Sequence, residues 1–168
     1  MAKNPVALII GAGDYLGGAL ARRFAREEFH VVGTRRRGDI ETLVAEIEAT
    51  GGKATGIHND AQKEEEVVDL VERIERDIGA VEVFIFNVGG NVKFPIVETT
   101  TRVYTKVWEM CALAEFLTGR EVSRRMIERG RGTMLFTGAT ASVKGSSGFS
   151  AFAGGKHALR ATGGKHGA

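Results

Sequence analysis

The sequence predicts an α/β fold: a doubly wound parallel sheet of about five strands between two helical layers, a three-layer αβα arrangement. Three observations favour it. Short apolar runs alternate with longer segments whose apolar residues recur at helical spacing. The run at 81–86 is apolar at five of six positions, which is typical of a central parallel strand covered on both faces. A glycine-rich turn joins the first apolar run to the first helical segment.

Composition is that of one ordinary globular domain. The chain has 168 residues, 43% apolar and 26% charged, and we expect a domain over 1–161 with a flexible tail over 162–168. A net charge of +2 gives no electrostatic case for a nucleic-acid partner. No apolar run approaches membrane-spanning length, and the start of the chain does not resemble a signal peptide. The single cysteine, Cys111, fits a reducing compartment, so we expect a cytoplasmic protein.

The first strand, Val6–Ile10, leads into the sequence GAGDYLG at 11–17, and a helical run follows to residue 29. Glycines allow a tight reversal and close packing of the helix on the strand. The free N–H groups at the start of such a helix bind phosphate. The turn therefore predicts a Rossmann-like dinucleotide site, with an ordinary βα turn as the alternative. Its candidate residues are Gly11, Gly13, Asp14, Tyr15, Leu16 and Gly17.

The second strand, 30–34, ends in a run of arginines that begins at Arg35. In a dinucleotide fold an acidic residue at this place binds the ribose 2′-hydroxyl, whereas arginine suits a 2′-phosphate. No carboxylate stands between the end of this strand and Asp39. Arg35 and Arg36 therefore favour NADP(H) over NAD(H), with NAD(H) kept as an alternative cofactor. A solvated loop of charges is the other interpretation.

The later segments continue the alternation. Helices are expected over 40–51, 63–78, 102–129 and 150–161, and strands over 53–58, 81–86 and 132–137. Asp60, with Ala61 beside it, follows the third strand, where an aspartate can accept a hydrogen bond from an adenine amino group or cap the next helix. The fourth strand ends in Asn87, Val88 and Gly89, where glycine leaves room for a flat ligand. No metal site is predicted.

Taken in order, these landmarks resemble the short-chain dehydrogenase/reductase family from Val6 to about Arg160. The glycine turn is similar to the family's, although Tyr15 stands where its middle glycine is usual. Asp60 resembles the adenine-contacting aspartate, and residues 87–89 resemble the asparagine-alanine-glycine element. Residues 152–156 align with the tyrosine-x-x-x-lysine signature. The resemblance implies a dinucleotide-dependent oxidoreductase with a small-molecule substrate of unknown identity.

The departures concern the catalytic set that the resemblance implies. Phe152 stands where the family's tyrosine exchanges a proton with the substrate. The position of the family's serine falls on Ala139, with Thr140 next to it as a weak candidate and Ser142 as a weaker one. The family's asparagine falls near Met110 or Cys111, and Cys111 is expected to be a core residue. Lys156 alone remains, with the expected role of holding the cofactor ribose.

These departures leave two hypotheses. One is an NADP(H)-using oxidoreductase, in which Tyr15, Tyr104 or His157 would have to supply the proton. The other is a catalytically silent sensor or partner subunit that binds the dinucleotide. The resemblance also implies that the family continues beyond this chain's last residue, so we expect a truncated member. A homo-oligomer is then expected only with an incomplete form of the usual dimer face.

Overall fold

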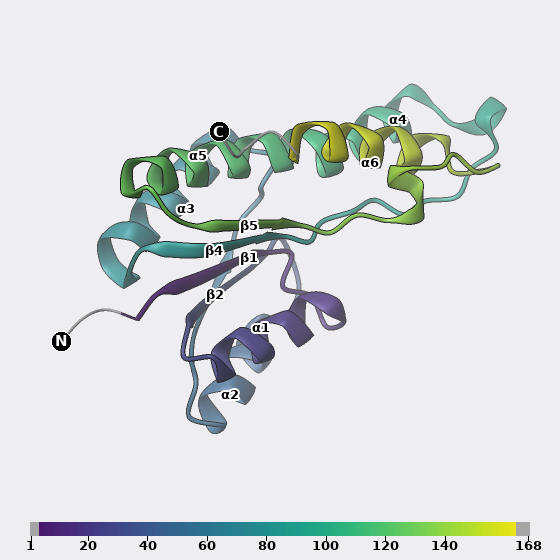
Figure 1. Cartoon of the computed structure of the whole chain (residues 1–168). Coiled ribbons are helices and arrows are strands. Elements are labelled where there is room, and N and C mark those ends of the chain that lie inside the picture. The colour runs from purple at the N-terminus through teal and green to yellow at the C-terminus, as the bar shows by residue number, and fades with distance from the viewer. Residues whose placement is uncertain (1–3, 164–168) are drawn as a thin grey trace.

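The computed structural model describes residues 4–163 and confirms the predicted fold (Figure 1). Five parallel strands form one sheet in the order β3-β2-β1-β4-β5. The strands are β1 (Val6–Ile10), β2 (His30–Arg35), β3 (Lys53–His58), β4 (Val81–Phe86) and β5 (Thr133–Phe136). The helices are α1 (Leu16–Arg26), α2 (Glu41–Ala49), α3 (Glu64–Arg73), α4 (Thr101–Trp108), α5 (Ala114–Arg129) and α6 (Ser150–Gly163).

Helices cover both faces of the sheet. Figure 1 shows α1 and α2 on one side of it and α3, α5 and α6 on the other. All five residues of β1 are buried. Because side chains alternate along a strand, Ala7 and Ile9 pack in the core under α1 and α2, while Leu8 and Ile10 pack in the core with α3, α5 and α6. The apolar run at the start of the chain is thus explained by its central place between two cores.

The order of the strands creates a switch point beside β1. The chain moves from β1 to β2 and β3 on one side, and then crosses back to place β4 on the other side of β1. Connections leave in opposite directions at this point, which opens a crevice at the carboxyl ends of the strands. The glycine turn after β1 and the residues after β2 and β4 therefore converge on the same edge of the sheet.

Two of the expected helices contain a wider turn. The segment expected as one helix over 63–78 consists of α3 followed by a π-helical turn, η1 (Ile74–Ile78). The long helix over 102–129 consists of α4, a π-helical turn η3 (Glu109–Leu113) and α5. Short 3₁₀ turns, η2 (Ile96–Glu98) and η4 (Thr140–Ser142), lie outside the segments predicted as strands or helices.

Some predicted helix ends were wrong. The first helix ends at Arg26 rather than residue 29, because Glu28 takes a φ of 64° and Phe29 turns back to pack edge-on against Phe24, with ring centroids 5.5 Å apart. The last helix continues past Ala161 to Gly163, where the Thr162 hydroxyl donates to a Glu115 carboxylate oxygen at 2.5 Å. Thr162 and Gly163 thus belong to α6. The rest of the expected tail, 164–168, lies outside the described residues.

Candidate cofactor-binding site

A cleft of about 350 Å³ lies at the carboxyl ends of β1, β2 and β4. It brings together most of the residues predicted to bind a cofactor: Gly11, Gly13, Arg35, Arg36, Asp60, Ala61, Asn87, Val88 and Gly89. Met110 and Ala114 close its side nearest η3 and α5. Asp14 lines a neighbouring hollow instead. The side chain of Tyr15 is turned to solvent, at 92% exposed, and Leu16 is also exposed, so binding by these two residues stays a prediction.

Two glycines of the turn are required by packing. Gly11 has a φ of +88°, and a Cβ atom there would lie 2.6 Å from the Asn87 carbonyl oxygen. A Cβ atom on Gly17 would lie 2.2 Å from the Gly11 carbonyl oxygen. Gly13 differs, because it has no positive φ and its missing Cβ would meet no atom within 4 Å. The expected role of Gly13 in reversing the chain was wrong, and its open surroundings instead leave the turn's backbone accessible from the cleft.

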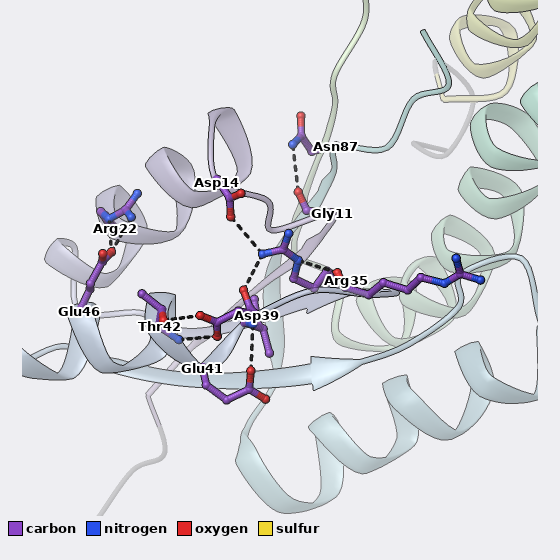
Figure 2. Close-up of polar contacts among 11 residues, drawn as sticks. Gly11, Asp14, Arg22, Arg35, Asp39, Glu41, Thr42, Glu46 and Asn87 are labelled. Atoms are coloured by element: carbon purple, nitrogen blue, oxygen red, sulfur yellow. Dashed lines mark hydrogen bonds and ion pairs between the residues drawn. The ribbon is translucent and has the colours of Figure 1, made fainter. Parts of the chain in front are cut away.

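The three arginines at the end of β2 and directly after it lie in different environments. The Arg35 guanidinium is held by Asp14 and by backbone carbonyls of the following loop (Figure 2). Arg36 has an Nη1 atom 4.0 Å from Asp60 Oδ2 and a side chain that is 39% exposed. Arg37 also lines the cleft. A negatively charged group entering this end of the cleft would therefore meet Arg36 and Arg37 more readily than Arg35.

Asp60 organises the loop between β3 and α3. Its Oδ1 atom accepts hydrogen bonds from the backbone N–H and the side-chain amide of Gln62, both at 3.2 Å. Its own N–H donates to a Glu66 carboxylate oxygen at 2.8 Å. The residue before α3 is Lys63, which makes no side-chain capping bond. The interpretation of Asp60 as the cap of α3 was therefore wrong. One oxygen of its carboxylate stays directed toward Arg36.

Sequence reasoning missed a neighbouring residue, Asn59. Its side chain is buried, and its Nδ2 atom donates to the Glu66 carbonyl oxygen at 3.0 Å. That bond fixes which end of the amide is the oxygen, because only the nitrogen can donate. The Oδ1 atom is buried and has no hydrogen-bond partner in the described part of the chain, although Asn59 lines the cleft. A buried acceptor without a partner is costly, and a ligand with an N–H donor, such as adenine, would satisfy it.

Lys156 lies against Val88 and Gly89, two residues that line the cleft. Its Nζ atom donates to the carbonyl oxygens of Val88 at 2.9 Å and Thr137 at 2.8 Å. The side chain is only 4% exposed, and this burial lowers the pKa of the Lys156 ammonium below its ordinary value. A Cβ atom on Gly89 would lie 3.3 Å from Lys156 Cε and 3.6 Å from Phe152 Cε2. Lys156 and Phe152 thus meet the backbone of the element that follows β4.

The expected hydroxyl candidates, Thr140 and Ser142, both lie in η4. Thr140 is exposed in η4, and Ser142 is buried with its Oγ atom accepting the Ala139 N–H at 3.0 Å. The position matched to the family's serine is therefore an alanine, and its backbone N–H already donates a hydrogen bond to the Ser142 hydroxyl. Thr140 stays a weak candidate for a role in catalysis.

The substitute proton donors lie elsewhere. Tyr104 directs its hydroxyl at the α4–α6 contact, where a Cβ atom on Gly154 would lie 2.9 Å from it. His157 holds the Ala153 carbonyl oxygen through Nδ1 at 2.9 Å and lines a separate hollow beside Ser142. Neither residue lines the cofactor cleft. Cys111 is fully buried against Gly155, as expected of a core residue.

Two negative findings apply to residues 4–163. Over that range, no group of three or more His, Cys, Asp or Glu side chains is placed to hold a metal ion. No helix in the same range has the length and apolar character needed to cross a bilayer.

The fold and the cleft together define a Rossmann-like dinucleotide-binding architecture. A sequence model of the short chain dehydrogenase family matches residues 5–162, and the chain belongs to that family. A short-chain dehydrogenase structure from Rhodopseudomonas palustris is 50% identical, with a TM-score of 0.90 over 95% of this chain and 75% of that chain. Members of the family are oxidoreductases that use NAD(P)(H).

Curated relatives are more distant. The 2-dehydro-3-deoxy-D-gluconate 5-dehydrogenase of Formosa agariphila is 28% identical over 94% of this chain and 61% of its own length. The human dehydrogenase/reductase SDR family member 4 is 30% identical over 93% of this chain and 57% of its own length. The chain therefore spans about three fifths of the length of these relatives.

Proposed function

We propose that this chain binds NADP(H), as other members of its family bind a dinucleotide, and that its standard proton-transferring side chains are replaced. One observation carries the proposal: a single cleft joins the open backbone at Gly13, the arginines at the end of β2 and Val88, whose carbonyl oxygen accepts a hydrogen bond from the buried Lys156. The unpartnered Asn59 Oδ1 in the same cleft fits an adenine amino group. The substrate is a small molecule whose identity the cleft does not indicate.

Each part of the cleft has a separate task in this proposal. The amides of the turn would bind the diphosphate, and Arg36 would attract a 2′-phosphate. Lys156 spends two N–H groups on Val88 and Thr137, which leaves its third for a ribose hydroxyl. When bound, the nicotinamide supplies hydride transfer. The residues of the chain position it, but Phe152 cannot give or take a proton.

The missing hydroxyls set the expected rate. General acid–base catalysis contributes roughly 10²–10⁴-fold, and an oriented oxyanion donor on the order of 10²–10³-fold. A site with Phe152 and Ala139 lacks both by the family's usual route. We therefore propose slow turnover of a carbonyl or alcohol, or, as the second candidate, a catalytically silent subunit that binds the dinucleotide. The second is favoured by the placement of Tyr104 and His157 outside the cleft.

A titration of NADPH fluorescence, paired with turnover on a panel of carbonyl substrates, tests both candidates. Binding with measurable turnover supports the oxidoreductase, and binding without turnover supports the silent subunit. Absence of binding at millimolar NADPH and NADH would contradict both. The double variant Phe152→Tyr/Ala139→Ser restores both family hydroxyls. Its gain of activity would show that the rest of the site is assembled, whereas continued inactivity with bound cofactor would favour the silent subunit.

The expected location and assembly belong to the same proposal. A single free cysteine, Cys111, is buried in the structure and is consistent with the proposed cytoplasmic location. A homo-oligomer is proposed as well. The molar mass of the purified chain in solution tests this proposal.

A further inference from the structure

The pairing of Asp14 with Arg35 has a consequence for cofactor choice. We propose that Asp14 is a specificity-determining residue: its carboxylate holds the Arg35 guanidinium and so lowers the preference for a 2′-phosphate. This inference rests on the proposed cofactor cleft. Asp14 is an acidic residue of the glycine turn, and it lies against a run of arginines.

Arg35 forms a wall between two spaces. Together with Gly13 it lines both the cofactor cleft and a second hollow of about 490 Å³ between α1 and α2. The second hollow also contains Asp14, Asp39 and Glu46, and its polar contacts are drawn in Figure 2. A charge placed on the hollow side of Arg35 therefore acts on a group that also faces the cleft.

The Arg35 guanidinium is already engaged. Its Nη1 atom donates to Asp14 Oδ1 at 3.1 Å and to the Asp39 carbonyl oxygen at 2.5 Å. Its Nε atom donates to the Arg37 carbonyl oxygen at 2.9 Å. The side chain is only 20% exposed. Arg35 thus shapes the loop after β2, and a phosphate would have to compete with Asp14 for it.

Asp14 is placed to compete. Its side chain is 79% exposed, and it follows Gly13 at the start of the helix whose amides would bind the diphosphate. A carboxylate at this place neutralises Arg35 and so weakens the attraction between Arg35 and a dianionic phosphate. Arg36 in turn faces the Asp60 carboxylate. Two of the three arginines are therefore opposed by a carboxylate, and the discrimination between phosphate and hydroxyl is smaller than the arginine run alone indicates.

The test uses two probes that lack the nicotinamide half: adenosine 2′,5′-bisphosphate and adenosine 5′-monophosphate. Their dissociation constants are measured by calorimetry for the full chain and for Asp14→Asn, which keeps the side chain's size. We expect the affinity ratio, bisphosphate over monophosphate, to rise about fivefold, which corresponds to about 1 kcal/mol for one exposed charge interaction. Glu46→Gln is the matched control, because Glu46 pairs with Arg22 in the second hollow but does not line the cleft. Its ratio should not change.

A double variant shows whether the effect passes through Arg35. In an Arg35→Ala background, Asp14→Asn should change the ratio by less than about twofold. An unchanged or lower ratio in Asp14→Asn, or a full fivefold rise that persists without Arg35, would overturn the inference. If neither probe binds the unaltered chain at millimolar concentration, the cofactor-site proposal fails and this inference fails with it. Binding of both probes with an unchanged ratio leaves the cofactor site standing and refutes only the role of Asp14.

Discussion

The side-chain amide of Asn87 donates a hydrogen bond to the carbonyl oxygen of Gly11 at 3.0 Å. The backbone N–H of Asn87 donates to the Ile10 carbonyl oxygen at 2.8 Å as well. The side chain of Asn87 therefore joins the end of β4 to the glycine turn (Figure 2), and its backbone joins β4 to the end of β1. This joint lies at the switch point of the sheet, where the shape of the turn decides whether its amides face the cleft.

Replacing Asn87 should loosen this joint. Asn87→Ala removes the donor to Gly11, and we expect the free energy of unfolding to fall by about 1 kcal/mol and NADPH to bind more weakly. Urea denaturation and an NADPH titration measure the two effects. Asn91→Ala is the control, because Asn91 is exposed in the loop that follows. Equal stability of the two variants would show that the Asn87 bond contributes nothing to the turn.

Substitutions at two glycines of the turn should distinguish an effect on packing from an effect on cofactor binding. Gly17→Ala places a Cβ atom against the Gly11 carbonyl oxygen, which is backbone and cannot move aside cheaply. We expect this variant to unfold at lower urea and to lose cofactor binding. Gly13→Ala meets no atom within 4 Å, so its stability should stay close to that of the unaltered chain while its Cβ obstructs the dinucleotide. If Gly13→Ala binds NADPH normally, the diphosphate lies elsewhere.

Much of the fold was predictable, because its signals are local. Val6–Ile10 and Val81–Phe86 are apolar throughout or nearly so, and their burial on both faces follows from that pattern. The cleft was predictable because residues at the carboxyl ends of parallel strands must meet there. The order of landmarks also predicted Lys156 as a site residue. Its burial against the residues after β4 depends on tertiary packing, which the sequence does not reveal.

The parts that could not be predicted depend on contacts between distant residues. Asn59 reads as an ordinary loop residue until Glu66 in α3 takes up its Nδ2 and leaves Oδ1 unpartnered. The run of arginines looks uniform in sequence, but Asp14, separated from Arg35 by an entire helix, makes that one arginine different. The end of α6 was misjudged because Thr162 is held by Glu115, a partner that local pattern does not reveal.

The arginines should differ in what their loss affects. Arg36→Ala should weaken NADPH binding more than NADH binding and leave stability unchanged, because the only ion pair of Arg36 within residues 4–163 is the long one to Asp60. The Arg35→Ala/Arg36→Ala variant should show the same preference with an added loss of stability, since Arg35 holds the carbonyl oxygens of Arg37 and Asp39. Fluorescence titrations with both cofactors provide the comparison, and Arg26→Ala, at the exposed end of α1, is the control. Equal weakening of NADPH and NADH would remove the 2′-phosphate argument.

The buried ammonium of Lys156 should make stability depend on alkaline pH. Burial lowers the pKa of Lys156 in the folded chain below the ordinary value of 10.5. As the pH rises through the folded pKa toward 10.5, the folded chain releases this proton before the unfolded chain does. The unfolded state then binds more protons, so the contribution of Lys156 to the free energy of unfolding becomes more favourable as pH increases.

The comparison of interest is therefore between the unaltered chain and Lys156→Met. The difference in their free energies of unfolding should shift in favour of the unaltered chain from about pH 8 to about pH 10, measured by urea denaturation at each pH. The neutral amine still donates to Val88 and Thr137, so these bonds do not cancel the effect. Lys144→Met, which removes an exposed lysine, should show no such shift. A difference that stays flat, or that moves against the unaltered chain, would mean that burial imposes no cost on the charge of Lys156.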